Sequence, residues 1–249
     1  ELMSILEEAD LPEGLINVVT GFGPTTGAPL IEHDDVRMIS FTGGTKGGSA
    51  ANLSASKKVK PIIMELGGKS PQIIFRDTDI NLSVNGVVSG IFPVAGHSCI
   101  SGSRILVHKN IKDAFTNKLL EVVKKAKVGS PNDPSTQIGP IANKEQYEFI
   151  LSKIEDAEKR GLKLLIDGRK ENKSEGYYIG PTIFDNVPNE DDLAQNEIFG
   201  PVASIQTWED ENEVIKIAND TIYGLAAGIW TKDTNKAIRL ADKIEAGTV

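Results

Sequence analysis

Apolar and polar residues follow two different rhythms along the chain, and the two rhythms alternate. Short runs rich in β-branched residues predict strands, whereas apolar positions that recur every three or four residues predict helices. We expect strands over these ranges: 15–20, 36–42, 59–66, 71–75 and 104–108. We expect helices over 1–9, 111–126, 147–157, 211–219 and 234–246, with two shorter ones that end at His33 and Ala55.

Strands that alternate with helices of ten or more residues are typical of parallel α/β sheets. The fold class predicted from this order is therefore α/β, built on parallel sheets. The sequence contains no internal repeat and no low-complexity linker. The longest irregular stretch, 129–143, carries prolines, and we expect it to cross the surface.

Composition narrows the function classes. Thirty-nine per cent of the 249 residues are apolar, which is enough for a sizeable core, so a disordered chain is excluded. The net charge of −8 disfavours nucleic acid as a partner, because no net positive field would attract phosphates. A single cysteine cannot form an internal disulfide, which fits a reducing compartment, and we expect a cytoplasmic protein.

The sequence shows no signal peptide and no membrane span, so we expect no membrane partner. Its longest uncharged candidate, 80–103, contains five serines and four glycines, and we expect it to be buried in protein and not in lipid. Glu1 begins in the middle of a helical pattern, and a strand pattern starts just before Val249. We therefore expect the chain to be a fragment of a longer protein.

Two glycine-rich turns follow predicted strands and precede predicted helices. The turn GFGPTTG, residues 21–27, has the setting of a phosphate or dinucleotide site, with the spacing G-x-G-x-x-x-G. The turn FTGG, residues 41–44, would bring backbone N–H groups close to a phosphate. A plain structural turn fits both patterns at least as well, so both interpretations stay open at this point.

Cys99 lies in the small, glycine-rich stretch GHSCISGS, residues 96–103. A free cysteine is most often a small buried apolar residue, but these neighbours suit a loop that a ligand approaches. A thiol, with an ordinary pKa of about 8.5, needs an N–H-rich turn or a nearby base to act as a nucleophile. His97 is the nearest base in sequence, although adjacent side chains in an extended loop diverge. His33 and His108 join no set of metal ligands, and we expect both at the surface.

Two glutamates interrupt apolar or glycine-rich stretches. Glu65 follows three apolar residues and stands shortly before a double glycine, where it would serve as a general base or, alternatively, as a surface residue paired with Lys69. Glu197 lies in NEIFGPV. Its carboxylate would accept hydrogen bonds from a hydroxyl pair such as that of a ribose, or would simply end a helix in solvent.

Four segments together resemble the aldehyde dehydrogenase superfamily. MELGGKSPQIIF, GHSCISGSR, NEIFGPV and YGLAAGIWTKD follow one another in the family's order and at closely similar spacing. The resemblance extends from Glu1 to Val249. It implies a Rossmann-like portion, residues 1–64, that forms the C-terminal half of a dinucleotide-binding domain. An α/β catalytic domain, residues 65–249, would follow it.

The resemblance also implies roles for individual residues. Cys99 matches the catalytic nucleophile, and Glu65 matches the general base. Glu197 and Phe199 match the pair that holds the nicotinamide ribose and ring. The glycines on the family's dinucleotide turns are Gly23, Gly27, Gly43 and Gly44. The implied cofactor is NAD or NADP, with no metal. The implied substrate is a small-molecule aldehyde, and the full-length protein would be a homo-oligomer, either a dimer or a tetramer.

The implied reaction oxidises an aldehyde to a carboxylic acid. A cysteine thiohemiacetal loses hydride to NAD(P)+, and the resulting thioester is hydrolysed by water that a glutamate activates. Release of the thioester to coenzyme A is a variant that Glu65 argues against. Two alternatives come from other classes. One is a cofactor-independent cysteine hydrolase that uses Cys99 and His97, and the other is an inactive α/β fragment.

Overall fold

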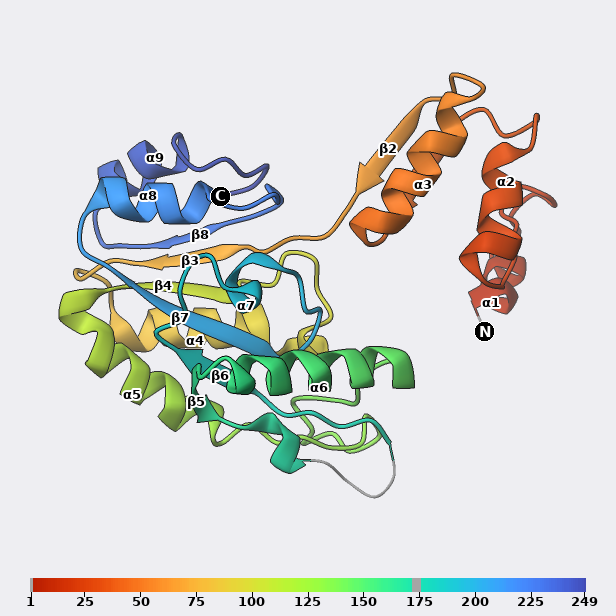
Figure 1. Ribbon diagram of the computed structural model, residues 1–249. Coiled ribbons are helices and arrows are strands. Elements are labelled where there is room, and N and C mark those ends of the chain that lie inside the picture. The colour runs from red at the N-terminus through yellow and green to blue at the C-terminus, as the bar shows by residue number, and fades with distance from the viewer. Residues whose placement is uncertain (1, 172–175) are drawn as a thin grey trace. The chain divides into compact units, whose positions relative to one another are not determined.

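The computed structural model describes residues 2–171 and 176–249, which form two compact units. The first unit comprises residues 1–66 and the second residues 67–249. The boundary predicted after residue 64 lies two residues before this division. Both units combine helices with parallel strand pairs, so the predicted fold class is confirmed (Figure 1).

The first unit is a short β-α-β arrangement preceded by helical turns. Its elements in chain order are α1 (Leu2–Glu8), η1 (Gly23–Gly27), α2 (Ala28–Glu32), β1 (Ile39–Thr42), α3 (Thr45–Ser56) and β2 (Ile62–Glu65). β1 and β2 pair in parallel and are joined by the crossover helix α3. Gly48 lets α3 lie close to Leu66, because a Cβ on Gly48 would come within 2.5 Å of the Leu66 Cδ2 atom.

The predicted strand over 15–20 is wrong. This stretch is irregular, and Leu15 and Val19 are each 64% exposed. Within the described part of the first unit the sheet consists of β1 and β2, so the stretch has no neighbouring strand. β-branched residues favour an extended strand only where a sheet supplies hydrogen-bond partners and a surface to pack on.

The second unit is built on a six-stranded sheet in the order β5-β6-β7-β4-β3-β8, parallel except between β5 and β6. Its strands are β3 (Pro71–Ile74), β4 (Arg104–His108), β5 (Lys163–Ile166), β6 (Thr182–Asp185), β7 (Val202–Trp208) and β8 (Gly228–Trp230). Its α-helices are α4 (Ile80–Ile91), α5 (Lys112–Val123), α6 (Lys144–Lys159), α7 (Asp192–Gln195), α8 (Glu211–Asn219) and α9 (Thr234–Ala241). Short helical turns are η2 (Pro93–Gly96), η3 (Lys109–Ile111) and η4 (Gly168–Glu171).

Helices cover both faces of the six-stranded sheet (Figure 1). On one face, α8 and α9 pack over a cluster that includes Ile73, Leu106 and Trp208. On the other face, α4, α5 and α6 cover a larger cluster that includes Ile74 and Ile105. Because consecutive strand residues point to opposite faces, a strand covered on both faces must be apolar throughout. This explains the uninterrupted apolar runs of the sequence.

Buried Arg104 ties the start of β4 to two other segments. Its guanidinium donates to the carbonyl of Lys69 at 2.8 Å and to the carbonyls of Ile217 and Ala218 at 3.0 and 2.7 Å. The last two carbonyls lie at the end of α8, where C=O groups have no partner within the helix. Arg104 therefore fixes the backbone at Lys69, the residue that follows Gly67 and Gly68.

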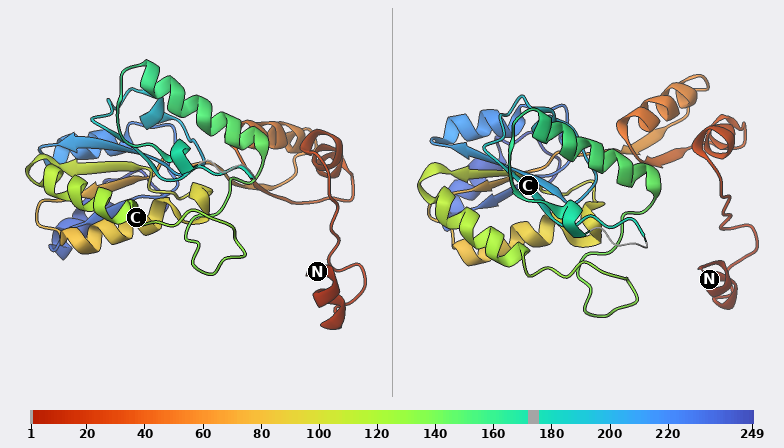
Figure 2. Two further views of the ribbon diagram at one scale, coloured as in Figure 1. Left: turned by 90° about the horizontal axis from the view of Figure 1, so that it is seen from below. Right: turned by 60° about the horizontal axis from the view of Figure 1, so that its bottom comes forward.

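The sequence placed some elements at their observed bounds and missed others. The predicted strand 104–108 and helix 211–219 coincide with β4 and α8, and 129–143 is an open, irregular loop (Figure 2). The uncharged stretch 80–103 contains α4, whose apolar side is buried, as expected. Strands β5 to β8 were not predicted individually.

The prediction that His108 lies at the surface is wrong. Its side chain is 7% exposed, and its ring packs edge-on against Trp208 with 4.8 Å between the ring centroids. The Nδ1 atom accepts the amide of Asn110 at 3.1 Å, so the imidazole ends β4 instead of facing solvent. His33 is exposed, with 64% of its side chain accessible.

Candidate active site

Cys99 lies in a turn that follows α4 and η2, and its side chain is partly buried. The backbone before it is unusual, because Val94, Ala95 and Gly96 have φ values of 54°, 52° and 73° in succession. Left-handed backbone at non-glycine residues is sparsely populated and tends to occur at functional sites. Gly96 has no room for a side chain, since a Cβ there would lie 2.2 Å from the carbonyl of Gly200.

Gly67 and Gly68 bring Cys99 and Glu197 to the same short stretch of backbone. The amide of Gly68 donates to Glu197 Oε1 at 3.1 Å. A Cβ on Gly68 would lie 2.3 Å from the carbonyl oxygen of Cys99, and a Cβ on Gly67 would lie 2.3 Å from Glu197 Oε2. Only glycine permits the approach at Gly68, because the neighbouring atom there belongs to the backbone. The second unit thus joins three of the segments that the sequence analysis singled out.

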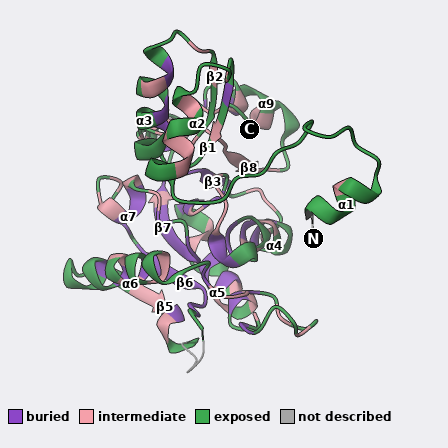
Figure 3. Cartoon of the chain, turned by 90° about the vertical axis from the view of Figure 1, so that its right-hand side faces the viewer, coloured by how far each residue is buried: buried purple, intermediate pink, exposed green. Residues whose placement is uncertain are grey.

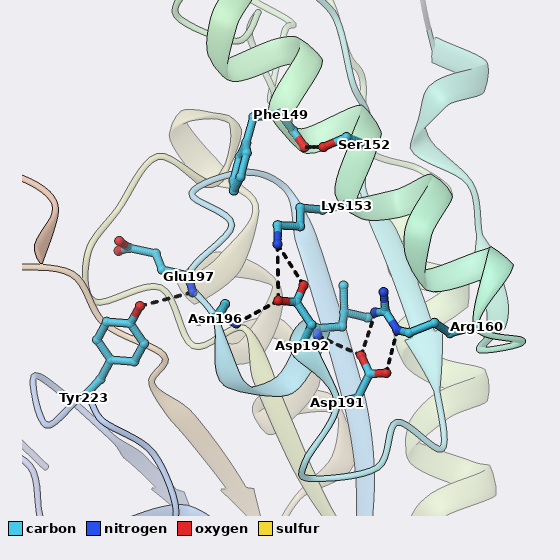
Figure 4. A network of polar contacts seen from close by, with 10 residues as sticks. Phe149, Ser152, Lys153, Arg160, Asp191, Asp192, Asn196, Glu197 and Tyr223 are labelled. Carbon is cyan, nitrogen blue, oxygen red and sulfur yellow. Dashed lines mark hydrogen bonds and ion pairs between the residues drawn. The ribbon is translucent and has the colours of Figure 1, made fainter. Parts of the chain in front are cut away.

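Glu197 and Phe199 follow the short helix α7, which Asp191 begins by accepting the amide of Leu193 at 2.8 Å. Phe199 has a φ of 54°, and its ring lies 5.4 Å from the ring of His97 between centroids. On the other side of Glu197, the hydroxyl of Tyr223 lies 3.5 Å from the Glu197 amide (Figure 4). The structure therefore places Glu197 half-buried between two segments, and not at a free helix end.

The charges around Glu197 are unusual for a partly exposed loop. Burial raises the pKa of Glu197, although the Gly68 amide and the charge of Lys69 oppose this effect. Lys69 is only 2% exposed, and burial together with the charge of Arg104 lowers its pKa to about 7. Asp192 and Glu197 are the anions that favour the charged form of Lys69. The site thus contains a buried amine and a carboxylate whose charges depend on each other.

His97 does not pair with Cys99 in the described structure. No hydrogen bond joins the two side chains, and the ring of His97 lies against Phe199 instead. Its Nε2 atom is buried without a partner. Burial lowers the pKa of His97, so the imidazole is neutral at pH 7. The geometry that a cysteine–histidine dyad requires is therefore not formed.

Glu65 belongs to the first unit, where it is the last residue of β2 and is exposed. Its backbone carbonyl accepts the amide of Gly43 at 3.1 Å, and its Cα partner in the sheet is Thr42. The glycine turn at Gly43 and Gly44 and the backbone of Glu65 are thus adjacent at the carboxyl end of a parallel strand pair, the end at which ligands bind in α/β sheets.

A cavity of about 730 Å³ lies in the first unit among η1, α2, β1 and α3. Its lining includes Gly23 and Gly27 of the first glycine turn, but neither Gly43 nor Gly44. Most of the remaining lining residues are small or apolar: Pro24, Ala28, Leu30, Ile31, Val36, Met38, Ile39, Phe41, Gly47, Ala50 and Ala51. Such a lining suits the flat, largely apolar face of a ring system.

The sequence analysis assigned no role to several residues that shape these sites. Gly68 and Gly96 stood in quoted motifs, but only the structure shows which neighbours require glycine there. Buried Lys69 was considered solely as a partner of Glu65. The one signal in the sequence is the seven-residue spacing of Gln146, Lys153 and Arg160, of which only Lys153 lies within the predicted helix 147–157.

In residues 2–171 and 176–249, no group of three or more His, Cys, Asp and Glu side chains is placed to hold a metal ion. Over the same ranges, no helix has both the length and the apolarity needed to cross a membrane.

A model of the aldehyde dehydrogenase family matches residues 1–249, which is the whole chain. The chain belongs to the aldehyde dehydrogenase family. Among curated relatives, aldehyde dehydrogenase 1A1 of Gallus gallus is 44% identical over 247 residues, covering 99% of this chain and 48% of the relative. Betaine aldehyde dehydrogenase of Brucella anthropi is 42% identical over 250 residues, covering 99% of this chain and 51% of the relative.

Solved structures of similar proteins have the same fold as this chain. An NAD+ complex of an aldehyde dehydrogenase from Bacillus cereus superposes with a TM-score of 0.96 at 36% identity, over 99% of this chain and 50% of that one. HpcC from Thermus thermophilus superposes with a TM-score of 0.95 at 40% identity, over 100% of this chain and 49% of that one. The chain spans about half the length of the relatives that it matches.

Proposed function

We propose that this protein oxidises an aldehyde to a carboxylic acid and transfers hydride to NAD or NADP. The observation that carries the proposal is the junction at Gly68, which contacts the backbone of Cys99 and donates its amide to Glu197. A nucleophilic thiol and a carboxylate suited to a ribose are thereby fixed on one rigid unit. Membership of the aldehyde dehydrogenase family supports the same conclusion.

In this proposal Cys99 is the nucleophile and Glu65 the general base. The Cys99 thiol first loses its proton to solvent. The thiolate then attacks the aldehyde carbon, and the backbone amide of Cys99 is a suitable donor to the resulting oxyanion. The thiohemiacetal collapses as hydride leaves, which gives a thioester. Glu65 then takes a proton from water, which attacks the thioester and releases the acid and the thiol. When bound, the nicotinamide ring supplies the hydride acceptor that no side chain can provide.

The residues present fit a dinucleotide. Glu197 Oε1 is occupied by the Gly68 amide, whereas Oε2 accepts no hydrogen bond from the described residues and is available to a hydroxyl. Phe199, 39% exposed, follows two residues later in the same segment and offers a ring. In the first unit, Gly23 and Gly27 line the cavity, and Gly43 and Gly44 supply the second turn. We therefore assign residues 1–64 to nucleotide binding and residues 65–249 to catalysis.

The decisive experiment separates formation of the thioester from its hydrolysis. With an aliphatic aldehyde and NAD+ or NADP+, Cys99→Ala should abolish any burst of reduced nicotinamide in stopped-flow absorbance. Glu65→Gln should still form the thioester, with up to one equivalent of reduced nicotinamide, while steady turnover falls by about 10²–10⁴. Near-normal turnover of Glu65→Gln would reject the base. A cofactor-independent cysteine hydrolase would show no nicotinamide reduction at all.

The nucleotide cavity has its own test. Ala50→Trp places a large ring at a cavity-lining position of α3, whereas Asn52→Trp adds the same ring at an exposed position outside the lining. We expect only Ala50→Trp to weaken NAD+ binding, by about tenfold or more, in calorimetric titration. Equal affinities of the two variants would place the nucleotide elsewhere.

Two remaining parts of the proposal concern the whole protein. We propose a cytoplasmic homo-oligomer, dimer or tetramer, on the strength of family membership. Light scattering during size-exclusion chromatography measures the mass directly, and a monomer at micromolar concentration would contradict the oligomer.

A further inference from the structure

Helix α6 presents three polar side chains, spaced seven residues apart, to the segment that carries Glu197 and Phe199. Residues at this spacing lie along one side of a helix. Gln146 donates to the carbonyls of Ile198 and Phe199 at 2.8 and 3.1 Å. Farther along α6, Lys153 reaches Asp192 and Arg160 reaches Asp191. One helix thus contacts the segment at both of its ends.

Lys153 is the more buried of the two basic side chains in these contacts, since 37% of the Arg160 side chain is exposed. Its Nζ atom lies 2.9 and 3.2 Å from the two carboxylate oxygens of Asp192, and only 23% of the side chain is exposed. The amine also lies 5.4 Å from the centroid of the Phe149 ring, within range of a cation–π interaction. Figure 4 shows Lys153 pointing toward the carboxylate of Asp192.

Asp192 also contacts Asn196, the residue before Glu197, and so links Lys153 to it. Its Oδ1 atom accepts the side-chain amide of Asn196 at 2.7 Å (Figure 4). Burial alone would raise the pKa of Asp192, but the hydrogen bonds from Lys153 and Asn196 outweigh it, so the pKa is lowered and the carboxylate is charged. Without Lys153, Asp192 would lose the cation that holds it in this orientation, and Asn196 would lose a fixed acceptor.

Glu197 itself has few contacts of its own. Within residues 2–171 and 176–249 the carboxylate accepts one hydrogen bond, from Gly68, and the Glu197 amide has a long contact of 3.5 Å with Tyr223. Phe199 is in the left-handed region, which a bulky residue does not adopt without support. The support comes from Gln146 on the C-terminal side and from Lys153, through Asp192 and Asn196, on the N-terminal side.

We infer that Gln146 and Lys153, the α6 brace, are positioning residues that hold Glu197 and Phe199 in the orientation needed to receive the nicotinamide ribose and ring. The purpose of that orientation, which is to receive the nicotinamide, rests on the proposed function. The contacts made by the brace do not. Arg160 is a natural control. It makes an equally short ion pair, at 2.8 Å, to the neighbouring Asp191, yet has no hydrogen-bonded link to Asn196.

The geometry is tested by amide hydrogen exchange at Gly68, followed by NMR in the 249-residue chain. Lys153→Met should raise the exchange rate of this amide by about tenfold, as expected for loss of a charge-assisted contact. Arg160→Met should leave it within about twofold, and Lys153→Arg should restore it. Gln146→Leu provides a second, uncharged variant with the same expected rise. Equal effects of Lys153→Met and Arg160→Met, or none in either brace variant, would overturn the inference.

Nucleotide titration then separates the two proposals. Glu197→Gln should weaken NAD+ binding or slow hydride transfer, and Lys153→Met should do so in the same direction but less. If Glu197→Gln changes neither NAD+ binding nor hydride transfer, the role assigned to Glu197 is rejected. The exchange rate of the Gly68 amide still tests the brace in that case. If Glu197→Gln acts and Lys153→Met does not, the brace is rejected and the proposed function stands.

Discussion

The two units use the same parallel strand pairing but differ sharply in how much they bury. Among the described residues of the first unit, the buried apolar side chains are Ile39, Ala51 and Ala55, whereas the second unit has two extensive clusters on the two faces of its sheet (Figure 3). In the first unit, large apolar side chains such as Phe22 and Val59 are 82% and 88% exposed. A two-stranded sheet with one crossover helix cannot bury enough apolar surface to be rigid.

This difference matters for the site. The contacts among Cys99, Gly68 and Glu197 all lie within the well-packed second unit. The glycine turns, the cavity and Glu65 lie in the sparsely packed first unit. The proposed nucleophile is therefore held in a well-packed unit, and the proposed base and nucleotide cavity are carried by a segment with little core of its own.

Proteolysis gives the largest expected contrast between the units. Residues 11–22 are irregular and exposed, so local opening there costs almost no free energy. A cut within strand β3 or β4, in contrast, requires global unfolding. We expect dilute thermolysin to cleave within 11–22 at least about 1,000-fold faster. Mass spectrometry of the early fragments identifies the cut, and first cuts inside β3 or β4 would reverse the comparison.

Removing a large core side chain should strongly destabilise the second unit. Phe184, fully buried in β6, leaves a cavity on substitution, so Phe184→Ala should lower the free energy of unfolding by about 3–5 kcal/mol. Leu82→Ala, at a position 66% exposed on α4, should change it by less than about 0.5 kcal/mol. Urea unfolding by tryptophan fluorescence reports on this unit because Trp208 and Trp230 are the two tryptophans of the chain. Similar losses in both variants would show that the second unit lacks a rigid core.

Arg104→Met tests whether polar ties inside the second unit matter as much as apolar packing. The variant leaves the carbonyls of Lys69, Ile217 and Ala218 without their donor, and we expect a loss of about 2–4 kcal/mol in the same assay. Arg239→Met, which removes a half-exposed ion pair to Glu211, is the matched control and should cost under about 1 kcal/mol. A loss no larger than that of the control would mean that water replaces the guanidinium.

Lowering the pH should reduce the stability of the second unit gradually. Burial alone would raise the pKa of Asp191, but the hydrogen bonds from Arg160 outweigh it, and the pKa lies below its ordinary value of 3.8. The pairing contributes stability that is present above pH 3.8 and is lost as the pH falls through the lowered pKa. We expect the urea midpoint to fall as the pH drops below about 4, and less steeply in Arg160→Met. Identical slopes would show that Arg160 does not set this dependence.

Local signals predicted part of this fold, and long-range contacts decided the rest. The β-branched strand at 104–108 and the amphipathic helix at 211–219 have their observed bounds, because hydrogen bonding and burial there agree with local pattern. The stretch 15–20 has an equally clear pattern but no neighbouring strand. His108 was placed at the surface because nothing in its local sequence reveals Trp208, a hundred residues later.

The candidate site shows the same limit. Motifs identified Cys99 and Glu197 individually, and family resemblance supplied their roles. Their common contact with Gly68 depends on segments 98 residues apart in the chain (197 − 99), which no local periodicity records. The burial of Lys69 and the strained backbone at Val94 and Ala95 likewise arise from tertiary packing.

The central place of β4 in the sheet also fixes the order in which the nascent chain can complete it. Arg104 of β4 pairs with Ser204 of β7, a separation of 100 residues (204 − 104). On a ribosome, β3 and β4 emerge together, but β5 and β6 can join them only through β7. Such distant pairing is slow and leaves apolar edges uncovered. Translation of residues 109–201 is therefore the interval in which a chaperone that shelters unpaired strands would most increase the yield of folded protein.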